Sequence, residues 1–343
     1  MLMVFVFSVS SIFMKIVITG GSGLIGKCLS ERLRAKGHAV FVLIRSKFNN
    51  SNQKNVSFTE KKLFWENAHE LSNADVIVHL AGARISDRWT KKHKQEILRS
   101  RTRSTEALIL ACKAVEHPPK HIVSMSGIGY YSDPCFSPQI ETSHHGSGFL
   151  AGVCLAWENA LHVAHLPSSK ISIVRTGLVL SNDSKIINAS ASQFYICGMV
   201  GSVGNKNALW SWIHIHDLCN IFSGLIENTI APGIYNAVAP TPCSQGEFGL
   251  AYERFPKKLN TYVLHYWIQN ALANLIQRMV HAIGLKWRPT LPGWLLRCFW
   301  GEKTVIALTN QNVSAKKLLD TGFCFQYDTI EKSLEHLSKN PTI

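Results

Sequence analysis

Four glycines within seven residues, directly after a short apolar run, constrain this chain more than any other feature. The apolar run Ile16–Ile18 is typical of a strand that is buried on both faces. Apolar residues at helical spacing follow the glycines, Gly37 stands where a helix C-cap is expected, and Ala39–Ile44 is a second apolar run. The pattern predicts a strand, a tight turn, a helix and a second strand. The glycines of the turn are Gly20, Gly21, Gly23 and Gly26.

A turn from a strand into a helix directs free backbone N–H groups and the positive end of the helix dipole at one point, which suits a pyrophosphate. Glycines let the turn bend tightly and let the phosphate approach the backbone. The spacing fits G-x-G-x-x-G in the strand and helix context that this motif requires. We therefore expect dinucleotide binding; the alternative is a glycine-rich turn without a ligand. The expected contacts are Gly20, Gly21, Ser22, Gly23, Leu24, Ile25 and Gly26.

The end of the second strand indicates which dinucleotide is bound. An acidic residue there would select NAD through the ribose hydroxyl, whereas an arginine accommodates the 2′-phosphate of NADP. The sequence has Ile44 and Arg45, followed by Ser46-Lys47, and no acidic residue nearby. It predicts NADP(H) in preference to NAD(H), with a solvated basic loop as the alternative.

The charge and the cysteine content of the chain limit the kinds of partner and the cellular compartment that we expect. The 343 residues include 36 Lys and Arg against 22 Asp and Glu, a formal charge of +14, which favours an anionic partner. The basic residues are scattered and form no nucleic-acid motif, so we expect no nucleic-acid partner. Nine cysteines, an odd number without a C-x-x-C pair, indicate free thiols in a cytoplasmic protein and no zinc site.

Changes in composition divide the chain. Residues 1–13 are apolar and uncharged but lack a basic n-region and a cleavage site, so we expect a dispensable extension, with a membrane tether as the alternative. Residues 14–240 carry the nucleotide-binding pattern. Residues 241–343 form a second region that is mainly helical. Within it, residues 249–289 look like an insertion and Leu259–Trp300 is rich in aromatic residues, which favours packing over membrane contact.

Two further stretches point to the cofactor. The strand Asp75–Leu80 ends in Ala81-Gly82, where small residues leave room for the cofactor. The long helix Trp89–Val115 places Arg101 among apolar inward positions. A buried arginine needs an anion, which Glu96 or Glu106 could supply locally, or else a phosphate of the cofactor.

Four residues are candidates for catalysis. Ser126 ends the predicted strand His121–Ser126, and Tyr130 and Tyr131 follow in a glycine-containing loop, where aromatic residues more often pack than transfer protons. His214 and His216 alternate in the extended stretch Trp212–Asp217, so we expect them to face opposite sides. A hydrogen-bonded structural histidine is favoured over a metal ligand here. We also expect Asp217 to be the N-cap of a helix that runs to Asn228, and a short strand over Phe323–Tyr327.

The ordered motifs resemble the extended short-chain dehydrogenase/reductase superfamily, and more closely its atypical epimerase-family branch with a C-terminal domain of unknown function. The likeness covers Met14–Phe248 and Leu291–Leu337. The resemblance implies a Rossmann-type doubly wound parallel α/β sheet, NADP(H), a small-molecule substrate near the C-terminal part, and, since dimers are common in the superfamily, a homodimer. The motifs are ITGGSGLIG, VIVHLAG, SRTRST, SGIGYY, VRTGLVL, WIHIHDL, YNAVAP and LLDTGFCF. Positions matching cofactor contacts of relatives are Ile44, Arg45, Leu80, Ala81, Glu96, Arg101 and Val179.

The sequence departs from the superfamily at its catalytic pair. Active members carry Tyr and Lys as Y-x-x-x-K on the helix after the fifth strand, where the Lys lowers the pKa of the Tyr and holds the nicotinamide ribose. Aligned on Glu158, these positions are Leu150 and Cys154, and no other Y-x-x-x-K occurs in Ser126–Ala164. Neither residue can replace the pair, which puts the standard mechanism in doubt.

Three functions therefore compete. The first is an NADP(H)-dependent oxidoreductase or sugar-nucleotide epimerase in which Tyr130, Tyr131 or His214 supplies the proton and Ser126 orients the substrate. The second is a non-catalytic NADP(H)-binding sensor or scaffold. The third is a membrane or cell-envelope interaction protein. We rank the enzyme first.

Overall fold

The computed structural model describes most of the predicted nucleotide-binding region and part of the C-terminal region. The extension 1–12, Arg45, residues 256–289 and most of Leu259–Trp300 lie outside the described residues, so the predictions for them stay predictions. The described residues are 13–44, 55–57, 71–131, 137–163, 166–183, 202–203, 205–255, 290–291, 293–294, 297 and 301–340.

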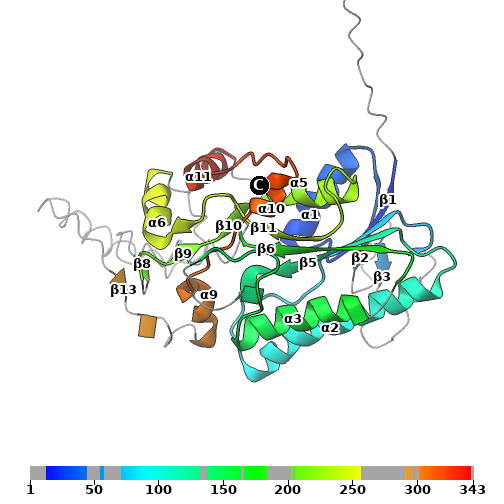
Figure 1. Cartoon of the computed structure of the whole chain (residues 1–343), viewed down its shortest axis with the longest axis horizontal. Helices are drawn as coiled ribbons and strands as arrows, with labels where there is room; N and C mark the ends of the chain where they lie inside the picture. Colours follow the sequence, from blue (N-terminus) through cyan, green and yellow to red (C-terminus); the bar gives the residue numbers. More distant parts are fainter. Residues whose placement is uncertain are drawn as a thin grey trace, which may run out of the picture.

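A parallel sheet of seven strands lies at the centre of the molecule (Figure 1). The strand order is β11-β6-β5-β4-β1-β2-β3, so the chain winds outward from β1 in one direction and from β4 in the other. This is the predicted doubly wound α/β fold. The strands are β1 Lys15–Thr19, β2 Ala39–Ile44, β3 Asn55–Ser57, β4 Val76–His79, β5 His121–Gly127, β6 Lys170–Thr176 and β11 Ile234–Ala237.

Helices cover both faces of the sheet, which explains the continuous apolar strands (Figure 1). In β1, Ile16 and Ile18 join the apolar cluster on the side of α1 and α5, whereas Val17 joins the cluster on the side of α2 and α3. Every residue of this run is therefore buried. The covering helices are α1 Leu24–Ala35, α5 Ile215–Ile226, α2 Lys91–Ala114 and α3 Gly148–Val163.

Short elements complete the described structure. The η2 turn directly continues β5, and Ser244 begins α6 with a capping box in which Glu247 is the partner. These elements are η2 Ile128–Tyr131, β7 Leu178–Leu180, β8 Ser202–Val203, β9 Leu209–Trp210, β10 Trp212–His214, β12 Cys243–Ser244, α6 Gln245–Arg254, β13 Thr290–Leu291, η4 Gly301–Thr304, α9 Val305–Leu308, α10 Lys316–Asp320 and α11 Ile330–Lys339.

The start of α5 differs from the prediction. The N-cap is His214, whose ring accepts a hydrogen bond from the backbone N–H of His216, and α5 ends at Ile226 instead of Asn228. Asp217 is not the N-cap: it lies inside the first turn, fully buried. Its carboxylate accepts hydrogen bonds of 2.9 Å from the N–H groups of Gln326 and Tyr327. These bonds also explain why the predicted strand at 323–327 is absent, since its N–H groups bind a side chain instead of a neighbouring strand.

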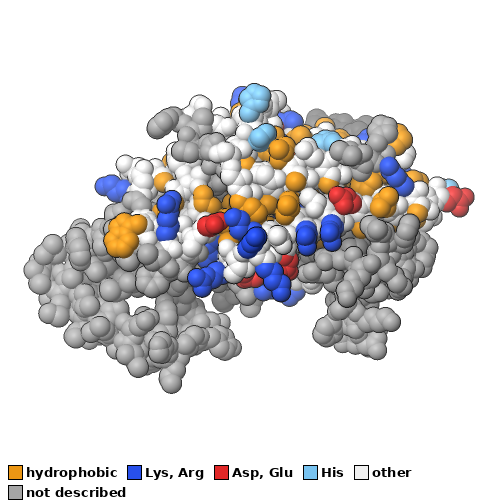
Figure 2. All heavy atoms as spheres, turned by 90° about the horizontal axis from the view of Figure 1, so that it is seen from below, with side chains coloured by type: hydrophobic (Ala, Val, Ile, Leu, Met, Phe, Trp, Pro, Cys, Tyr) orange, Lys and Arg blue, Asp and Glu red, His pale blue; other side chains and the backbone are white. Residues whose placement is uncertain are grey.

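The face that carries α2 and α3 shows lysine and arginine side chains dispersed among apolar and neutral ones, not gathered in one block (Figure 2). Within the described ranges, no helix combines the length and the apolar character needed to cross a membrane. The six described cysteines are all free thiols.

Candidate functional site

Three of the four glycines in the first turn are required by packing. Gly20 has a φ of +72°, and a Cβ there would lie 2.7 Å from the carbonyl of Leu80 at the end of β4. A Cβ on Gly21 would lie 2.5 Å from Cγ1 of Val42, and one on Gly26 would lie 2.5 Å from the oxygen of Gly20. Since a real side chain could not enter these spaces, the glycines let β1, β2, β4 and α1 meet closely.

Gly23 has a different environment, because it is exposed at the start of α1 and is less tightly enclosed than the other three. It is the N-cap, its φ is −77°, and a Cβ there would meet only the oxygen of Gly20, at 3.2 Å. No side chain caps this end of the helix and no acidic residue lies in its first turn. The N–H groups and the dipole of α1 are therefore available to an anion above Gly23.

The remaining predicted contacts of the first turn surround this point. Ser22 is exposed, while Leu24 and Ile25 are half-buried and pack on the same apolar cluster as Val179 of β7. Leu80 belongs to that cluster and continues into Ala81, whose N–H would lie 2.9 Å from a Cβ on Gly20. The backbone of Ile44 ends β2, and its side chain lies outside the described residues.

Arg101 is a buried cation at the same edge of the sheet. Its side chain lies beside Gly82, where a Cβ would approach Cζ to 3.0 Å, and its Nη1 donates to the oxygens of Ala83 and Ile97. The guanidinium carbon lies 5.0 Å from the centre of the Trp157 ring. Burial lowers the pKa of Arg101, but an arginine stays charged in proteins.

No carboxylate in the described part of the chain forms an ion pair with Arg101. Glu96, one of the two predicted local partners, is exposed and lies 3.4 Å from the ring of His93 instead. Glu106 is also exposed and forms no ion pair with Arg101. A buried guanidinium without a carboxylate is costly unless an anion reaches it. The arrangement therefore favours the second prediction, a phosphate, over a local acid.

A histidine that the sequence did not single out supports this part of the site. His79 at the end of β4 is fully buried, with its Nδ1 2.7 Å from the Thr19 hydroxyl and its Nε2 3.0 Å from the Thr105 hydroxyl. Burial, and then the charge of Arg101, lower the pKa of His79 to about 4. The ring is therefore neutral at pH 7 and ties β1, β4 and α2 together. The sequence signal that could have identified His79 is its position at the end of an apolar run that predicts a buried strand.

Ser126 and Tyr131, two of the catalytic candidates, belong to one buried polar network. The Ser126 hydroxyl donates a hydrogen bond to the Glu158 carboxylate at 2.7 Å. Arg175 forms a bidentate ion pair with the same carboxylate, in which Nε and Nη2 donate at 3.0 and 2.8 Å. Nη1 of Arg175 donates to the Tyr131 hydroxyl, which donates to Asn236. Burial raises the pKa of Tyr131 to about 12. Both hydroxyls thus hold β5, α3, β6 and β11 together.

Tyr130, the neighbour of Tyr131, is half-buried and keeps its hydroxyl outside this network. Its ring stacks on Arg175, whose guanidinium carbon lies 3.6 Å from the ring centre, and it meets His145 edge-on. Among the described residues, its hydroxyl forms no hydrogen bond. Tyr130 is therefore the catalytic candidate of this cluster whose hydroxyl remains available.

Leu150 and Cys154, the positions that match the Tyr-Lys pair, face the turn after β5. A Cβ on Gly129 would lie 3.2 Å from Cβ of Leu150, and one on Gly127 would lie 3.7 Å from the sulfur of Cys154. Burial raises the pKa of Cys154 to about 11, against the opposing effect of Arg101. Cys154 is therefore a neutral thiol at pH 7, next to the arginine.

His214 lies apart from these candidates, in a cluster with His216 and His336. The prediction that His214 and His216 face opposite sides is wrong, because α5 begins at Ile215 and turns the second ring back, so that the ring centres lie 5.0 Å apart. The nearest ring nitrogens of the three histidines all lie within 4.8 Å of one another. Tyr327 stacks on His214 at 3.8 Å.

Hydrogen bonding in this cluster favours the predicted structural role over metal binding. Nδ1 of His214 accepts from the N–H of His216, so the proton of the neutral ring is on Nε2, which donates to Nδ1 of His336 at 3.2 Å. A metal-binding histidine instead donates from its second nitrogen. Burial lowers the pKa of His214 to about 2 and that of His216 to about 4, so both rings are neutral.

The fold and the glycine turn define an NAD(P)-binding Rossmann protein of the short-chain dehydrogenase/reductase type. The chain belongs to the NAD dependent epimerase/dehydratase family, whose sequence pattern matches residues 16–237. A domain of unknown function, DUF1731, matches residues 291–337. The resemblance and the fold class expected from the sequence are both confirmed.

Similar proteins carry the same family description. An epimerase family protein of Staphylococcus aureus strain NCTC 8325 is 30% identical over 328 residues, which cover 94% of this chain and 98% of that protein. The crystal structure of the human epimerase family protein SDR39U1 with NADPH is 26% identical, with a TM-score of 0.75, and the match covers 95% of this chain and 100% of that one. The crystal structure of UDP-glucuronic acid 4-epimerase from Bacillus cereus in complex with UDP-glucuronic acid and NAD shares the fold at 16% identity and a TM-score of 0.68, and the match covers 96% of this chain and 99% of that one.

Proposed function

We propose that this protein binds NADP(H) in preference to NAD(H). The observation that carries dinucleotide binding is Arg101, a buried cation without a carboxylate partner among the described residues, at the edge of the sheet where the glycine turn and α1 also present positive potential. Arg45, the residue that follows Ile44 in the sequence, supports the choice of the phosphorylated cofactor. The similar human protein was solved with NADPH, which supports the same choice.

We further propose that this protein catalyses an NADP(H)-dependent oxidoreductase or epimerase-type reaction on a small molecule. We expect it to act as a homodimer in the cytoplasm. The bound cofactor would supply or accept a hydride. Gly23 and the α1 N-terminus would hold its pyrophosphate, and Arg101 would hold a further anionic group. Tyr130 is the group best suited to exchange a proton with the substrate, because its hydroxyl is outside the buried network.

The same residues also support a second candidate, a non-catalytic NADP(H)-binding sensor or scaffold. Leu150 and Cys154 match the positions of the superfamily's Tyr-Lys pair, and Cys154 is a neutral thiol. The hydroxyls of Ser126 and Tyr131 are hydrogen-bonded to Glu158 and Arg175, respectively, and are not free to contact a substrate. A protein that only binds the cofactor needs none of these groups for proton transfer.

Calorimetric titration with NADPH and NADH tests the cofactor proposal. Arg101→Gln should weaken NADPH binding by about thirtyfold or more, because a buried charge-assisted contact is worth at least about 2 kcal/mol. Arg103→Gln is the matched control, since Arg103 is exposed on the same helix. Arg45→Ala should weaken NADPH binding by about tenfold and leave NADH binding unchanged. Equal affinities for both cofactors in the wild type would overturn the stated preference.

The two candidate functions differ in their use of Tyr130. If the protein is an enzyme, a screen of carbonyl and hydroxyl compounds should reveal substrate-dependent loss of NADPH absorbance, and Tyr130→Phe should reduce that rate while NADPH affinity is retained. Tight NADPH binding without turnover across the screen would favour the sensor. Failure of both cofactors to bind would reject both candidates.

A further inference from the structure

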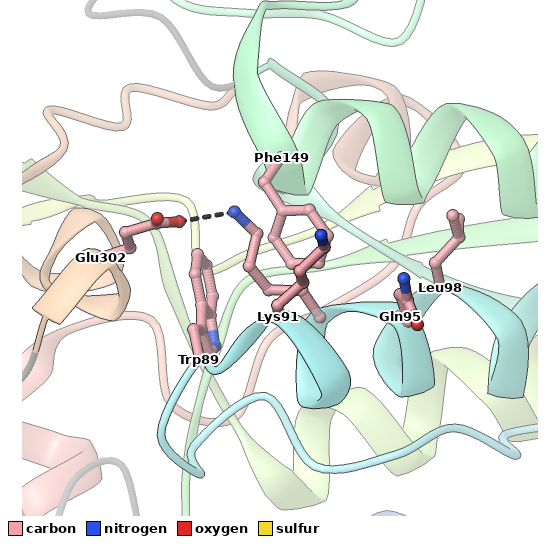
Figure 3. Close-up of a pocket in the computed structure, with 7 residues that line it drawn as sticks. Trp89, Lys91, Gln95, Leu98, Phe149 and Glu302 are labelled. Atoms are coloured by element: carbon pink, nitrogen blue, oxygen red, sulfur yellow. Dashed lines mark hydrogen bonds and ion pairs between the residues drawn. The ribbon is translucent and has the colours of Figure 1, made fainter.

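A cavity of about 380 Å³ lies beside the site, where three segments of the chain meet (Figure 3). The first turns of α2 supply Lys91, Lys94 and Gln95, the start of α3 supplies Phe149, and η4 supplies Glu302. Trp89 precedes α2 and closes one side. The cavity therefore joins the nucleotide-binding region to the part of the chain that matches the domain of unknown function.

The charge at this end of α2 is unfavourable for the helix itself. Its first four residues are Lys91, Lys92, His93 and Lys94, and no acidic residue lies in that turn. Cations at a helix N-terminus oppose the dipole, each at a cost of about 0.3–1 kcal/mol. An anion bound beside this turn would remove the conflict.

Only one of the cavity's two lysines is neutralised by a carboxylate in the described part of the chain. Lys94 forms a 2.5 Å ion pair with Glu302, drawn as the dashed line in Figure 3, and its ammonium lies 4.8 Å from the centre of the Phe149 ring. Lys91 has no ion pair with any described residue. The cavity thus keeps one net positive charge, and the amide of Gln95 lines it as a further polar group.

Two aromatic rings form the apolar wall. The rings of Trp89 and Phe149 meet edge to face, with centres 5.1 Å apart and planes at 69°. The indole N–H of Trp89 donates to the oxygen of Ile85 at 2.9 Å, so the ring is held in place and its polar atom is already satisfied. A flat apolar group fits such a wall better than a sugar or a chain of hydroxyls.

One apolar cluster connects the cavity lining to residues of the candidate site. Phe149 directly precedes Leu150, which packs on the turn at Gly129. Trp89 belongs to the same apolar cluster as Ile97, whose carbonyl accepts the hydrogen bond from Arg101. A ligand in the cavity would therefore contact Trp89 and Phe149, which belong to the same apolar cluster as Leu150, the position matched to the catalytic tyrosine.

We propose that this cavity binds the substrate's anionic, ring-bearing part, with a carboxylate or phosphate at Lys91 and a flat apolar ring against Trp89 and Phe149. This assignment rests on the proposed function, because it makes the cavity part of the substrate site. It names the substrate class as small molecules that join an acidic group to an apolar ring. Ligand binding would also hold η4 in place through the Lys94–Glu302 pair.

Binding of 2-naphthoate to the full chain, with and without saturating NADPH, tests the assignment by calorimetry. The uncharged 2-naphthamide and the ringless acetate should each bind at least about tenfold more weakly, since each lacks one of the two recognised groups. Lys91→Gln should weaken 2-naphthoate binding by about tenfold. The control Lys92→Gln should change it less than about twofold, because Lys92 is exposed like Lys91 but does not line the cavity.

The possible outcomes separate this inference from the proposed function. Equal binding of naphthoate and naphthamide, equal effects of the two lysine variants, or no binding of naphthoate would overturn the assignment even if NADPH binds tightly. Naphthoate binding that depends on Lys91 in a protein that binds no NADPH would support the anion cavity and reject the cofactor proposal. Phe149→Leu should weaken the binding of naphthoate more than the binding of acetate, because this substitution removes only the contact with the aromatic ring.

Discussion

The hydroxyl of Ser126 donates a 2.7 Å hydrogen bond to Oε1 of Glu158, the same oxygen that Nε of Arg175 binds at 3.0 Å. A serine at the carboxyl end of a central strand could orient a substrate, but here its proton is used in a buried ion pair. The side chains of Arg175 and Glu158 are only 3% and 6% exposed. This network therefore stabilises the contact between β5, α3 and β6 beneath the candidate site.

Glu158→Gln should destabilise the protein strongly. Removing one member of a buried ion pair leaves the other charge without compensation, at a cost of about 3–5 kcal/mol. Urea unfolding followed by circular dichroism measures the change. Glu96→Gln, on an exposed carboxylate, should shift the free energy of unfolding by less than about 1 kcal/mol. A loss below about 1 kcal/mol in Glu158→Gln would contradict the structural role of the network.

Two glycine variants should separate folding from cofactor binding. Gly26→Ala places a Cβ 2.5 Å from backbone atoms of Gly20 and Gly21, so we expect a loss of about 1–3 kcal/mol in unfolding free energy. In Gly23→Ala the Cβ would lie 3.2 Å from the oxygen of Gly20, a less severe contact that a shift of a few tenths of an ångström relieves, so the loss should be smaller than that of Gly26→Ala. The methyl group would instead stand between the backbone and a phosphate, so NADPH affinity should fall. Unchanged NADPH affinity in Gly23→Ala would count against the proposed anion position.

Acid should weaken the contact between α5 and α11. The pKa values of His214 and His216 are lowered to about 2 and about 4, below the value of about 6.5 expected in the unfolded chain. Unfolding therefore takes up protons below pH 6.5. The stability contributed by the neutral rings is complete above that pH, and each histidine loses up to about 1.4 kcal/mol per pH unit as the pH falls toward its folded value.

Urea unfolding at pH 7 and pH 5 checks this direction in the wild type and in His216→Asn. The variant has one such histidine fewer, so its loss between the two pH values should be smaller. The loss of stability that remains in the variant includes contributions from His79 and His121, because burial also lowers their pKa values to about 4. A wild-type protein that is equally stable at both pH values would contradict burial of these rings in the neutral form.

Asp217→Asn should loosen the segment around Gln326 and Tyr327. The carboxylate accepts two backbone N–H groups through two different oxygens, and an amide offers only one accepting oxygen. The second N–H would lose its partner, at a cost of about 1–3 kcal/mol. Limited proteolysis should cut near these residues faster than in the wild type. The exposed pair of Lys316 and Asp320 provides the control, and Asp320→Asn should leave the cleavage rate unchanged.

The parts of the fold that could be predicted from the sequence are those set by local patterns. The apolar runs of β1 and β2, the glycines between them, and the place of Arg101 among inward positions of α2 are all visible in short stretches. Their physical causes, burial on both faces and close backbone approach, act on neighbouring residues. The match of Leu150 and Cys154 to the superfamily's Tyr-Lys pair followed from the family resemblance, and their contacts with the turn after β5 came from the structure.

Features that depend on distant residues could not be predicted in this way. His336 meets His214 across 122 positions, and Asn236 meets Tyr131 across 105. The alternation of His214 and His216 misled because the strand becomes a helix between them, and a two-residue period has no meaning across such a boundary. The cavity near Lys91 likewise requires Glu302, far along the chain.

The bond between Asp217 and the Gln326–Tyr327 backbone sets an order of events during synthesis. The two N–H groups that satisfy this carboxylate are made 109 and 110 residues after it. At ribosomal rates of about 5–20 residues per second, these N–H groups are made about 5–20 seconds after Asp217, and until then its carboxylate lacks its partners. The central sheet can assemble on the ribosome, but the helix that packs on α1 reaches its final environment only when the later segment arrives.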